Sequence, residues 1–361
     1  MNGIKLKDKV IGNNYPPFII GDIGSNHNGD INLAKIMIDK ARDSGLDAVK
    51  FQTFDTGLFS SFCYEDHPRQ NEILKLDPTL RKHFSETHTE LKKEVKKYTF
   101  TQKQATEIKK YCKKKKIIYF TTPIYKESVD FNSDILNCEL IKIASMDLNN
   151  YPFIEYIAKK NKIIILSTGM STYNEVKKAI KTIKDTGNNK IILLHCISIY
   201  PPEDSIINLR NILKLQELFP EIPVGFSDHT FGYEIPLAAV ALGACVVEKH
   251  FTLHKDLPGW DHRISADPDD MKKIVKGSKR IYEALGKKER IVHDIELEKR
   301  KIFRRSLVAT KNLRKGHIIT NQDLDFKRPG IGIPPEDYKK IIGKELKKDI
   351  EYDELFSWTD F

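Results

Sequence analysis

Short runs of apolar residues recur between residues 18 and 250, and stretches with helical spacing separate them. Because the strands of a parallel sheet are buried on both faces, they read as continuous apolar runs without polar alternation. We therefore predict eight strands, over residues 18–24, 48–52, 117–122, 140–145, 163–168, 191–196, 224–227 and 245–250. Strands that alternate with helices indicate a parallel sheet.

Apolar residues three and four positions apart mark the segments between these strands as helices. The predicted helices cover residues 32–44, 102–115, 152–160, 173–185, 205–218, 233–242 and 268–285. Gly45, Gly187 and Gly243 stand just after three of them, where helices commonly end on a glycine. The repeat predicts an α/β fold of the (β/α)8 TIM-barrel type over residues 1–285.

Two parts of the chain depart from this repeat. Residues 53–101 contain no predicted strand, and a connection of this length is expected to be either a functional lid or substrate loop, or a surface ornament. Residues 286–302 are polar and charged and are predicted to be a linker. From residue 303 the apolar runs are short, with turns at LRKG and PG, so residues 303–361 are predicted to form a small β-rich domain.

The composition, with 40% hydrophobic and 30% charged residues, fits a soluble protein. No apolar run approaches the roughly 20 residues of a membrane helix, and the N-terminus lacks the apolar core of a signal peptide, so no membrane partner is expected. Five cysteines without a CxxC pair indicate reduced thiols and a cytoplasmic location. The net charge of +10 comes from lysines spread over helix faces, and the dense run at 113–116 ends a helix, so no nucleic-acid partner is predicted.

Polar side chains stand at the carboxyl ends of the predicted strands, which converge on one mouth in a barrel. These residues are Asp22, Lys50, Gln52, Thr122, Lys142, Ser145, Asp147, Ser167, Thr168, His195, Ser198, Tyr200, Ser227, His229 and His250. Two lysines among several hydroxyl groups predict a site for a phosphate-bearing substrate, because ammonium groups neutralise its charge and hydroxyl groups orient it. One such lysine alone would fit a solvated rim charge or a Schiff-base nucleophile equally well.

Two histidines, His229 and His250, follow consecutive strands with one helix between them. Either histidine alone would more often be a hydrogen-bonded structural residue, but two at equivalent strand ends favour a shared divalent metal with open positions. Such a metal polarises a carbonyl oxygen. A phosphate-bearing donor, a polarised carbonyl and a nearby carboxylate together suggest carbon–carbon bond formation onto an aldehyde.

The chain resembles the sialic acid (N-acetylneuraminate) synthase family, the phosphoenolpyruvate-dependent synthases of nine-carbon 2-keto acids. The motifs that carry the resemblance are GDIGSNHNGD, DAVKFQTF, TTP, IKIAS, ILSTGM, LLHCISIYP, FSDHT, VEKHFTL and PGWDH, with RRSLVA and KRPGIG in the tail. The resemblance implies a TIM barrel followed by a C-terminal antifreeze-like (SAF, β-clip) domain. It also implies a domain-swapped homodimer in which each tail covers the partner's barrel.

The resemblance also assigns residues to substrates. Phosphoenolpyruvate would contact Lys50, Thr122, Lys142, Ser145, Ser167, Ser198 and Ser227. The metal, usually manganese, with magnesium or cobalt as alternatives, would bind His229 and His250. The acceptor sugar would contact Asp22, Gln52, Asp147, Tyr200, Asp261 and, from the other subunit's tail, Arg328. Asp22 and Asp147 are also the candidates for orienting water or moving protons.

The implied reaction joins phosphoenolpyruvate to an N-acylated aldose and releases phosphate by C–O cleavage. The aldose would be N-acetylmannosamine or a 2,4-diacetamido-2,4,6-trideoxyhexose, giving an acid of the sialic, legionaminic or pseudaminic type. The chain departs from the family on the sugar side, since the family usually has Glu at Asp22 and Asp147, and Pro at Trp260. It also usually has Asn at Ser198. The alternatives are a synthase acting on another sugar or sugar phosphate, a Schiff-base aldolase, and a non-catalytic carbohydrate-binding protein.

Overall fold

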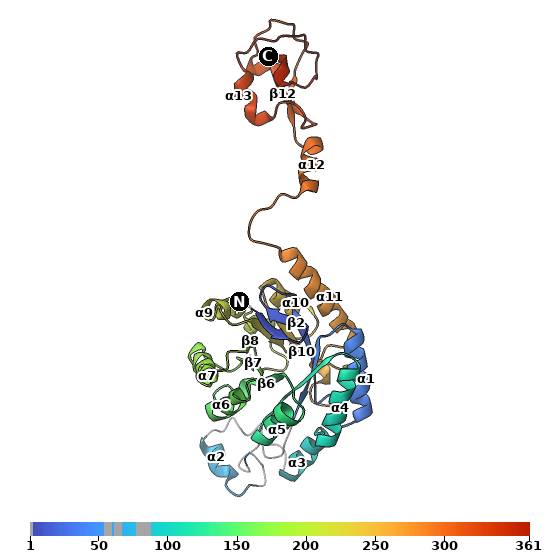
Figure 1. The fold of residues 1–361 in the computed structure, drawn as a ribbon, viewed down its shortest axis with the longest axis vertical. Helices are drawn as coiled ribbons and strands as arrows, with labels where there is room; N and C mark the ends of the chain where they lie inside the picture. Colours follow the sequence, from blue (N-terminus) through green and yellow to red (C-terminus); the bar gives the residue numbers. More distant parts are fainter. Residues whose placement is uncertain (1–2, 54–59, 61–66, 77–87) are drawn as a thin grey trace. The chain divides into compact units, whose positions relative to one another are not determined.

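The computed structural model describes residues 3–53, 60, 67–76 and 88–361 (Figure 1). The chain forms two compact units, Met1–Gly286 and Lys287–Phe361, which are described separately below. No helix in the described part is both long enough and apolar enough to cross a membrane.

The first unit contains a closed barrel of eight parallel strands, which confirms the predicted fold class. The strands are β3 (Phe18–Gly24), β4 (Ala48–Gln52), β5 (Ile118–Thr122), β6 (Leu140–Ile143), β7 (Ile163–Ser167), β8 (Ile191–Cys196), β9 (Val224–Asp228) and β10 (Val246–His250). They neighbour one another in sequence order, and β10 closes the ring by pairing with β3. All residues of β3, β6, β7, β8, β9 and β10 are buried, as expected from continuous apolar runs.

Helices surround the strand ring (Figure 1). They are α1 (Ile31–Asp43), α2 (Gln70–Leu76), α3 (His88–Lys97), α4 (Gln102–Lys114), α5 (Lys126–Asp130), α6 (Tyr151–Lys159), α7 (Tyr173–Asp185), α8 (Asp204–Ile207), α9 (Asn211–Leu218), α10 (Glu234–Ala241) and α11 (Pro268–Leu285). The predicted helix 205–218 is two helices, because Asn208 adopts a left-handed conformation (φ 49°) that ends α8. In the long connection after β4, α2 and α3 lie within the described residues, whereas 54–59, 61–66 and 77–87 lie outside them.

The barrel floor is closed by an N-terminal hairpin that the sequence pattern did not predict. Strands β1 (Gly3–Leu6) and β2 (Lys9–Gly12) pair antiparallel. Leu6 and Ile11 are fully buried in one cluster with inward-facing barrel residues such as Phe18 and Phe120. Successive strand residues point to opposite faces, so these apolar side chains fill the lower barrel, and the inward positions above them are polar. The polar inward-facing residues therefore lie directly above a packed apolar layer.

The second unit has a small core of its own, which includes Leu307, Ile341 and Phe356. Its regular elements are α12 (Asp294–Phe303), β11 (Ser306–Ala309), β12 (Leu324–Lys327) and α13 (Tyr338–Ile341), and β11 pairs antiparallel with β12. Three isolated antiparallel bridges add to this β structure. Helix α12 occupies much of the stretch predicted as a linker, and it has no buried residue within its own unit.

Candidate active site

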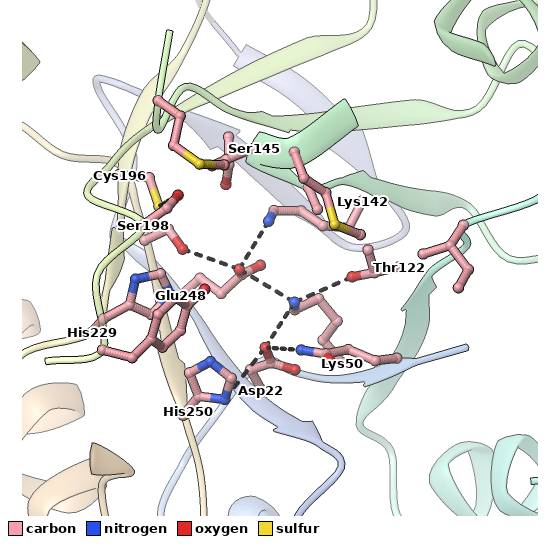
Figure 2. Close-up of a pocket in the computed structure, with 18 of the residues that line it drawn as sticks. Asp22, Lys50, Thr122, Lys142, Ser145, Cys196, Ser198, His229, Glu248 and His250 are labelled. Atoms are coloured by element: carbon pink, nitrogen blue, oxygen red, sulfur yellow. Dashed lines mark hydrogen bonds and ion pairs between the residues drawn. The ribbon is translucent and has the colours of Figure 1, made fainter. Parts of the chain in front are cut away.

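A cavity of about 340 Å³ opens at the carboxyl ends of the barrel strands (Figure 2). Most of the predicted site residues line it: Asp22, Lys50, Gln52, Thr122, Lys142, Ser145, Ser167, Ser198, Tyr200, Ser227, His229 and His250. They come from all eight strands or from the loops that directly follow them. The strand-end pattern therefore brings these residues to one place, as parallel strands in a barrel require.

Four buried charged side chains form the centre of the cavity (Figure 2). Lys50 Nζ lies 2.8 Å from Asp22 Oδ2 and 3.4 Å from Glu248 Oε1. Lys142 Nζ lies 3.1 Å from the same Glu248 oxygen. Each of the four side chains is 4% exposed, so the ammonium groups are held in a low-dielectric environment by two carboxylates.

The two lysines differ in their electrostatic surroundings. Burial acts to lower the pKa of Lys50, but the charges of Asp22 and Glu248 outweigh it and raise that pKa above the usual lysine value. Burial lowers the pKa of Lys142, because Glu248 offsets the loss of hydration only in part and Lys50 repels it. Lys142 is thus the cation with the less complete set of negative partners, and an incoming anion would stabilise its charge.

Hydroxyl groups surround the ammonium groups. Lys50 Nζ donates to Thr122 Oγ1 at 3.2 Å, and Ser227 Oγ donates to Glu248 at 3.2 Å. Ser167 Oγ is buried and has no hydrogen-bond partner among the described residues. The backbone N–H of Gly169 donates to Ser145 Oγ at 3.1 Å, and a Cβ at Gly169 would approach that oxygen to 2.8 Å. The close approach explains why the loop after β7 carries a glycine here.

The two histidine rings lie side by side at the rim, with centroids 5.5 Å apart. His229 Nδ1 lies 2.8 Å from the carbonyl oxygen of Ile197, so this nitrogen carries the proton that it donates. His250 Nδ1 faces Asp22 Oδ2 at 3.7 Å and Asp261 Oδ2 at 3.8 Å. The His229 ring therefore keeps Nε2 as a potential metal ligand, the orientation that a backbone acceptor gives to metal-binding histidines. His250 Nδ1 is buried and has no hydrogen-bond partner among the described residues, so this ring also has a nitrogen available as a ligand.

The remaining predicted residues lie at different distances from this centre. Gln52 donates from Nε2 to Asp22 Oδ2 at 3.3 Å, and Asp261 lies beside His250. Asp147 lies on a 3₁₀ turn at Ser145–Asp147 and does not line the cavity. Burial raises the pKa of its carboxyl group, which accepts a hydrogen bond from Asn150 at 3.4 Å.

Arg328 belongs to the second unit, where its guanidinium stacks on the ring of Phe303 at 5.3 Å.

Glu248 is the residue that the sequence pattern did not assign to the site. The alternation of side chains along a strand could have identified it. Glu248 stands two positions before His250 on β10, so the two side chains must point to the same face of the sheet. His195 shows the opposite case, since its Nε2 lies 2.7 Å from the carbonyl oxygen of Ile207 and its ring packs on Phe226, on the outer face of the strands. His195 is therefore a structural histidine.

Known proteins resemble this chain along nearly its whole length. The NeuB family matches residues 37–290, and the SAF domain matches residues 304–361. An N,N'-diacetyllegionaminic acid synthase of Campylobacter jejuni is 39% identical, over 93% of this chain and 98% of that protein. A pseudaminic acid synthase of Helicobacter pylori is 33% identical, over 92% and 94%. The crystal structure of a sialic acid synthetase from Leptospira borgpetersenii has a TM-score of 0.70 and 35% identity, over 82% of this chain and 95% of that one.

Proposed function

Because this chain belongs to the NeuB family, we propose that it condenses phosphoenolpyruvate with the open-chain form of an N-acylated aminohexose to give a nine-carbon 2-keto acid and phosphate. The observation that carries the proposal is the convergence of two buried lysines and two histidines on one cavity. The relatives reported above are legionaminic, pseudaminic and sialic acid synthases, which supports N-acetylmannosamine or a 2,4-diacetamido-2,4,6-trideoxyhexose as the acceptor.

Lys50 and Lys142 are the groups that we assign to the negative charges of phosphoenolpyruvate. Asp22 and Glu248 keep both ammonium groups in position before phosphoenolpyruvate binds. Binding therefore does not cost the entropy of ordering two mobile lysine side chains. We assign Thr122 to the donor carboxylate. The phosphate oxygens are assigned to Ser145, Ser167, Ser198 and Ser227. The unpartnered hydroxyl of Ser167 supports this assignment, because buried polar groups are rarely left without a partner.

We assign a divalent metal ion, manganese with magnesium or cobalt as alternatives, to His229 and His250. The residues present fit such an ion, because His229 donates from Nδ1 to a carbonyl oxygen and keeps Nε2 available, and the buried Nδ1 of His250 has no hydrogen-bond partner among the described residues. Within the described residues no group of three or more His, Cys, Asp and Glu forms a metal site. The two histidines alone leave coordination positions open, and in this proposal water or substrate oxygens occupy them. The ion would supply Lewis-acid polarisation of the aldehyde oxygen.

The proposed reaction forms one carbon–carbon bond and breaks one carbon–oxygen bond. C3 of the donor attacks the aldehyde carbon, whose oxygen takes up a proton and becomes a hydroxyl group. Water adds to the positively charged C2 and loses one proton, so that C2 carries a hydroxyl group and the phosphate ester. Cleavage of the bond between C2 and the ester oxygen then releases phosphate, which takes up the proton that the C2 hydroxyl loses as it becomes the keto group. Asp22 and Glu248 each keep one buried carboxylate oxygen without a partner among the described residues, so we assign to them the orientation and deprotonation of the water.

The acceptor is placed at the mouth of the cavity in this proposal. Tyr200 and Asp261 lie beside His250, and Gln52 contacts Asp22. All three offer hydrogen-bonding groups to sugar hydroxyls. Asp147 is kept as a more distant sugar contact, and Asp22 is preferred to it for proton transfer because only Asp22 lines the cavity. Arg328 of the partner subunit is proposed to complete the site in a domain-swapped homodimer.

The free thiols of the described cysteines support the proposal that this reaction takes place in the cytoplasm. These cysteines are Cys112, Cys138, Cys196 and Cys245. All four are buried, and none is paired in a disulfide. Reduced thiols are the usual state of cysteines in that compartment.

The test is phosphate release from phosphoenolpyruvate, measured with and without Mn²⁺ and with each acceptor in turn, followed by the mass of the product. We expect release only when both sugar and metal are present, and a product that contains the carbons of both substrates. Sugar binding without phosphate release would support a carbohydrate-binding protein instead. Turnover of sugar phosphates alone would place the chain with other synthases, and borohydride trapping of a lysine adduct would indicate an aldolase.

A further inference from the structure

A buried ion pair joins β9 to β10 directly beside the two histidines. Lys249 Nζ lies 2.5 Å from Asp228 Oδ2, and the two side chains are 1% and 0% exposed. Asp228 precedes His229 and Lys249 precedes His250, so each charged residue is the chain neighbour of one histidine. Because strand side chains alternate between faces, Asp228 and Lys249 lie on the outer face of the barrel, away from the cavity.

The ammonium group of Lys249 also holds the loop that follows His229. Its Nζ donates to the carbonyl oxygen of Thr230 at 2.7 Å. The N–H of Thr230 donates in turn to Asp228 Oδ1 at 2.9 Å. One lysine from β10 therefore fixes the residues on both sides of His229, through Asp228 and through Thr230. We call these three residues the histidine clamp.

The clamp also fixes the register of the two strands. Lys249 is the direct partner of Asp228 in the β9–β10 pairing, one position below the histidines. A slip by one residue would exchange the faces of the strand and would turn a histidine away from the cavity. It would also separate Lys249 from Asp228 and would leave the residue of the pair that stays on the outer face buried without its partner.

A buried ion pair is weak evidence for stability, because the loss of hydration roughly offsets the attraction, and apolar residues of similar size often serve as well. The clamp therefore needs another explanation. We propose that Lys249 and Asp228 are positioning residues that set the distance and orientation of His229 and His250 for a shared divalent ion. This inference rests on the metal site of the proposed function, and neither residue touches the substrates.

The test uses a double variant, Asp228→Asn/Lys249→Met, in which neither charge remains to be buried alone. The asparagine keeps an oxygen for the Thr230 N–H, and methionine keeps the apolar part of the lysine. We expect the full-length variant to remain folded and to bind Mn²⁺ about 10 to 100 times more weakly, as for other outer-shell partners of metal ligands. Binding is measured from the electron paramagnetic resonance signal of free Mn²⁺, without substrates or turnover.

Two further measurements separate positioning from general damage. The affinity for phosphoenolpyruvate, measured without metal, is expected to stay close to that of the wild type, and kcat at saturating Mn²⁺ is expected to recover. The matched control is Lys255→Met, which removes another lysine–aspartate pair of the same unit, at 2.5 Å from Asp270, and should leave Mn²⁺ binding unchanged.

The outcomes distinguish the two proposals. A wild-type protein that binds Mn²⁺ and a double variant that binds it equally well would overturn the clamp alone. A wild-type protein that does not bind Mn²⁺ would overturn the metal site of the proposed function, and the clamp with it. Equal losses of Mn²⁺ and phosphoenolpyruvate binding in the double variant would show a general structural role and would also reject positioning.

Discussion

At the scale of single residues, the two buried lysines do not contribute in the same way. Lys50 contacts the carboxylates of both Asp22 and Glu248, whereas in the described part of the chain Lys142 forms an ion pair only with Glu248. Removing Lys142 leaves Glu248 paired with Lys50, so the variant Lys142→Met should fold. Because a hydrogen bond to a charged group contributes about 1.5–3 kcal/mol, KM for phosphoenolpyruvate should rise roughly 10- to 100-fold.

Steady-state phosphate release checks this prediction. Lys162→Met is the control, because Lys162 is a lysine of the same barrel that donates to Asn137 at 2.7 Å outside the cavity. Its KM should equal that of the wild type. An unchanged KM in Lys142→Met would exclude Lys142 from the donor site.

His27 makes the stability of the barrel depend on pH. Its ring is buried and stacks on Phe100 at 3.9 Å, and its Nδ1 accepts the N–H of Gly29 at 3.0 Å. Burial lowers the pKa of His27 from 6.5 to about 4. The unfolded chain takes up a proton at His27 more readily than the folded chain does. The free energy of unfolding is therefore highest above pH 6.5 and falls as the pH drops from 6.5 toward 4. The loss is about 3 kcal/mol.

Urea unfolding at pH 7 and pH 4 measures this effect. The variant His27→Gln cannot titrate at this position, so the free energy of unfolding of the wild type should fall relative to the variant by up to about 3 kcal/mol over that range. The comparison removes the contribution of the other titrating groups, which both proteins share. A difference that does not change with pH would contradict the assignment.

At the scale of secondary-structure elements, the barrel could be predicted because each strand is a buried apolar run and each helix has a regular apolar spacing. The hairpin of β1 and β2 could not, because each strand has only four residues and alternates only weakly. Glu248 was missed because a glutamate inside an apolar strand becomes informative only when Lys50 and Lys142 are known to face it. Such partners lie far apart in the sequence and come together only in the closed ring.

The hairpin is predicted to stabilise the barrel without affecting the chemistry at the other end. Leu6 is fully buried against inward-facing barrel residues, so Leu6→Ala should lower the free energy of unfolding by about 2–5 kcal/mol through lost contacts and a cavity. KM values should not change. The exposed Lys5 of the same strand provides the control, and Lys5→Ala should stay within about 0.5 kcal/mol of the wild type. Equal stabilities of the two variants would show that the hairpin is dispensable.

At the scale of the whole molecule, the proposed site takes most of its residues from the barrel and one residue, Arg328, from the second unit. The barrel has its own core and contains the cavity, and the tail has a separate core. A chain truncated after Gly286 should therefore keep a folded barrel and lose turnover, because Arg328 is absent. Circular dichroism and phosphate release measure the two properties. Undiminished turnover in the truncated chain would remove the tail from the site.

Domain swapping makes a further prediction for two full-length variants that are each expected to be inactive, Arg328→Ala and His229→Ala. When they are co-expressed, half of the dimers should contain one copy of each. In such a dimer the barrel with an intact His229 receives the tail with an intact Arg328, so one of its two sites is complete. The mixture should show about one quarter of the wild-type rate per subunit, although each variant alone is inactive. If Arg328 acted on the barrel of its own chain, every site in the mixture would carry one of the two substitutions, and the mixture would stay inactive.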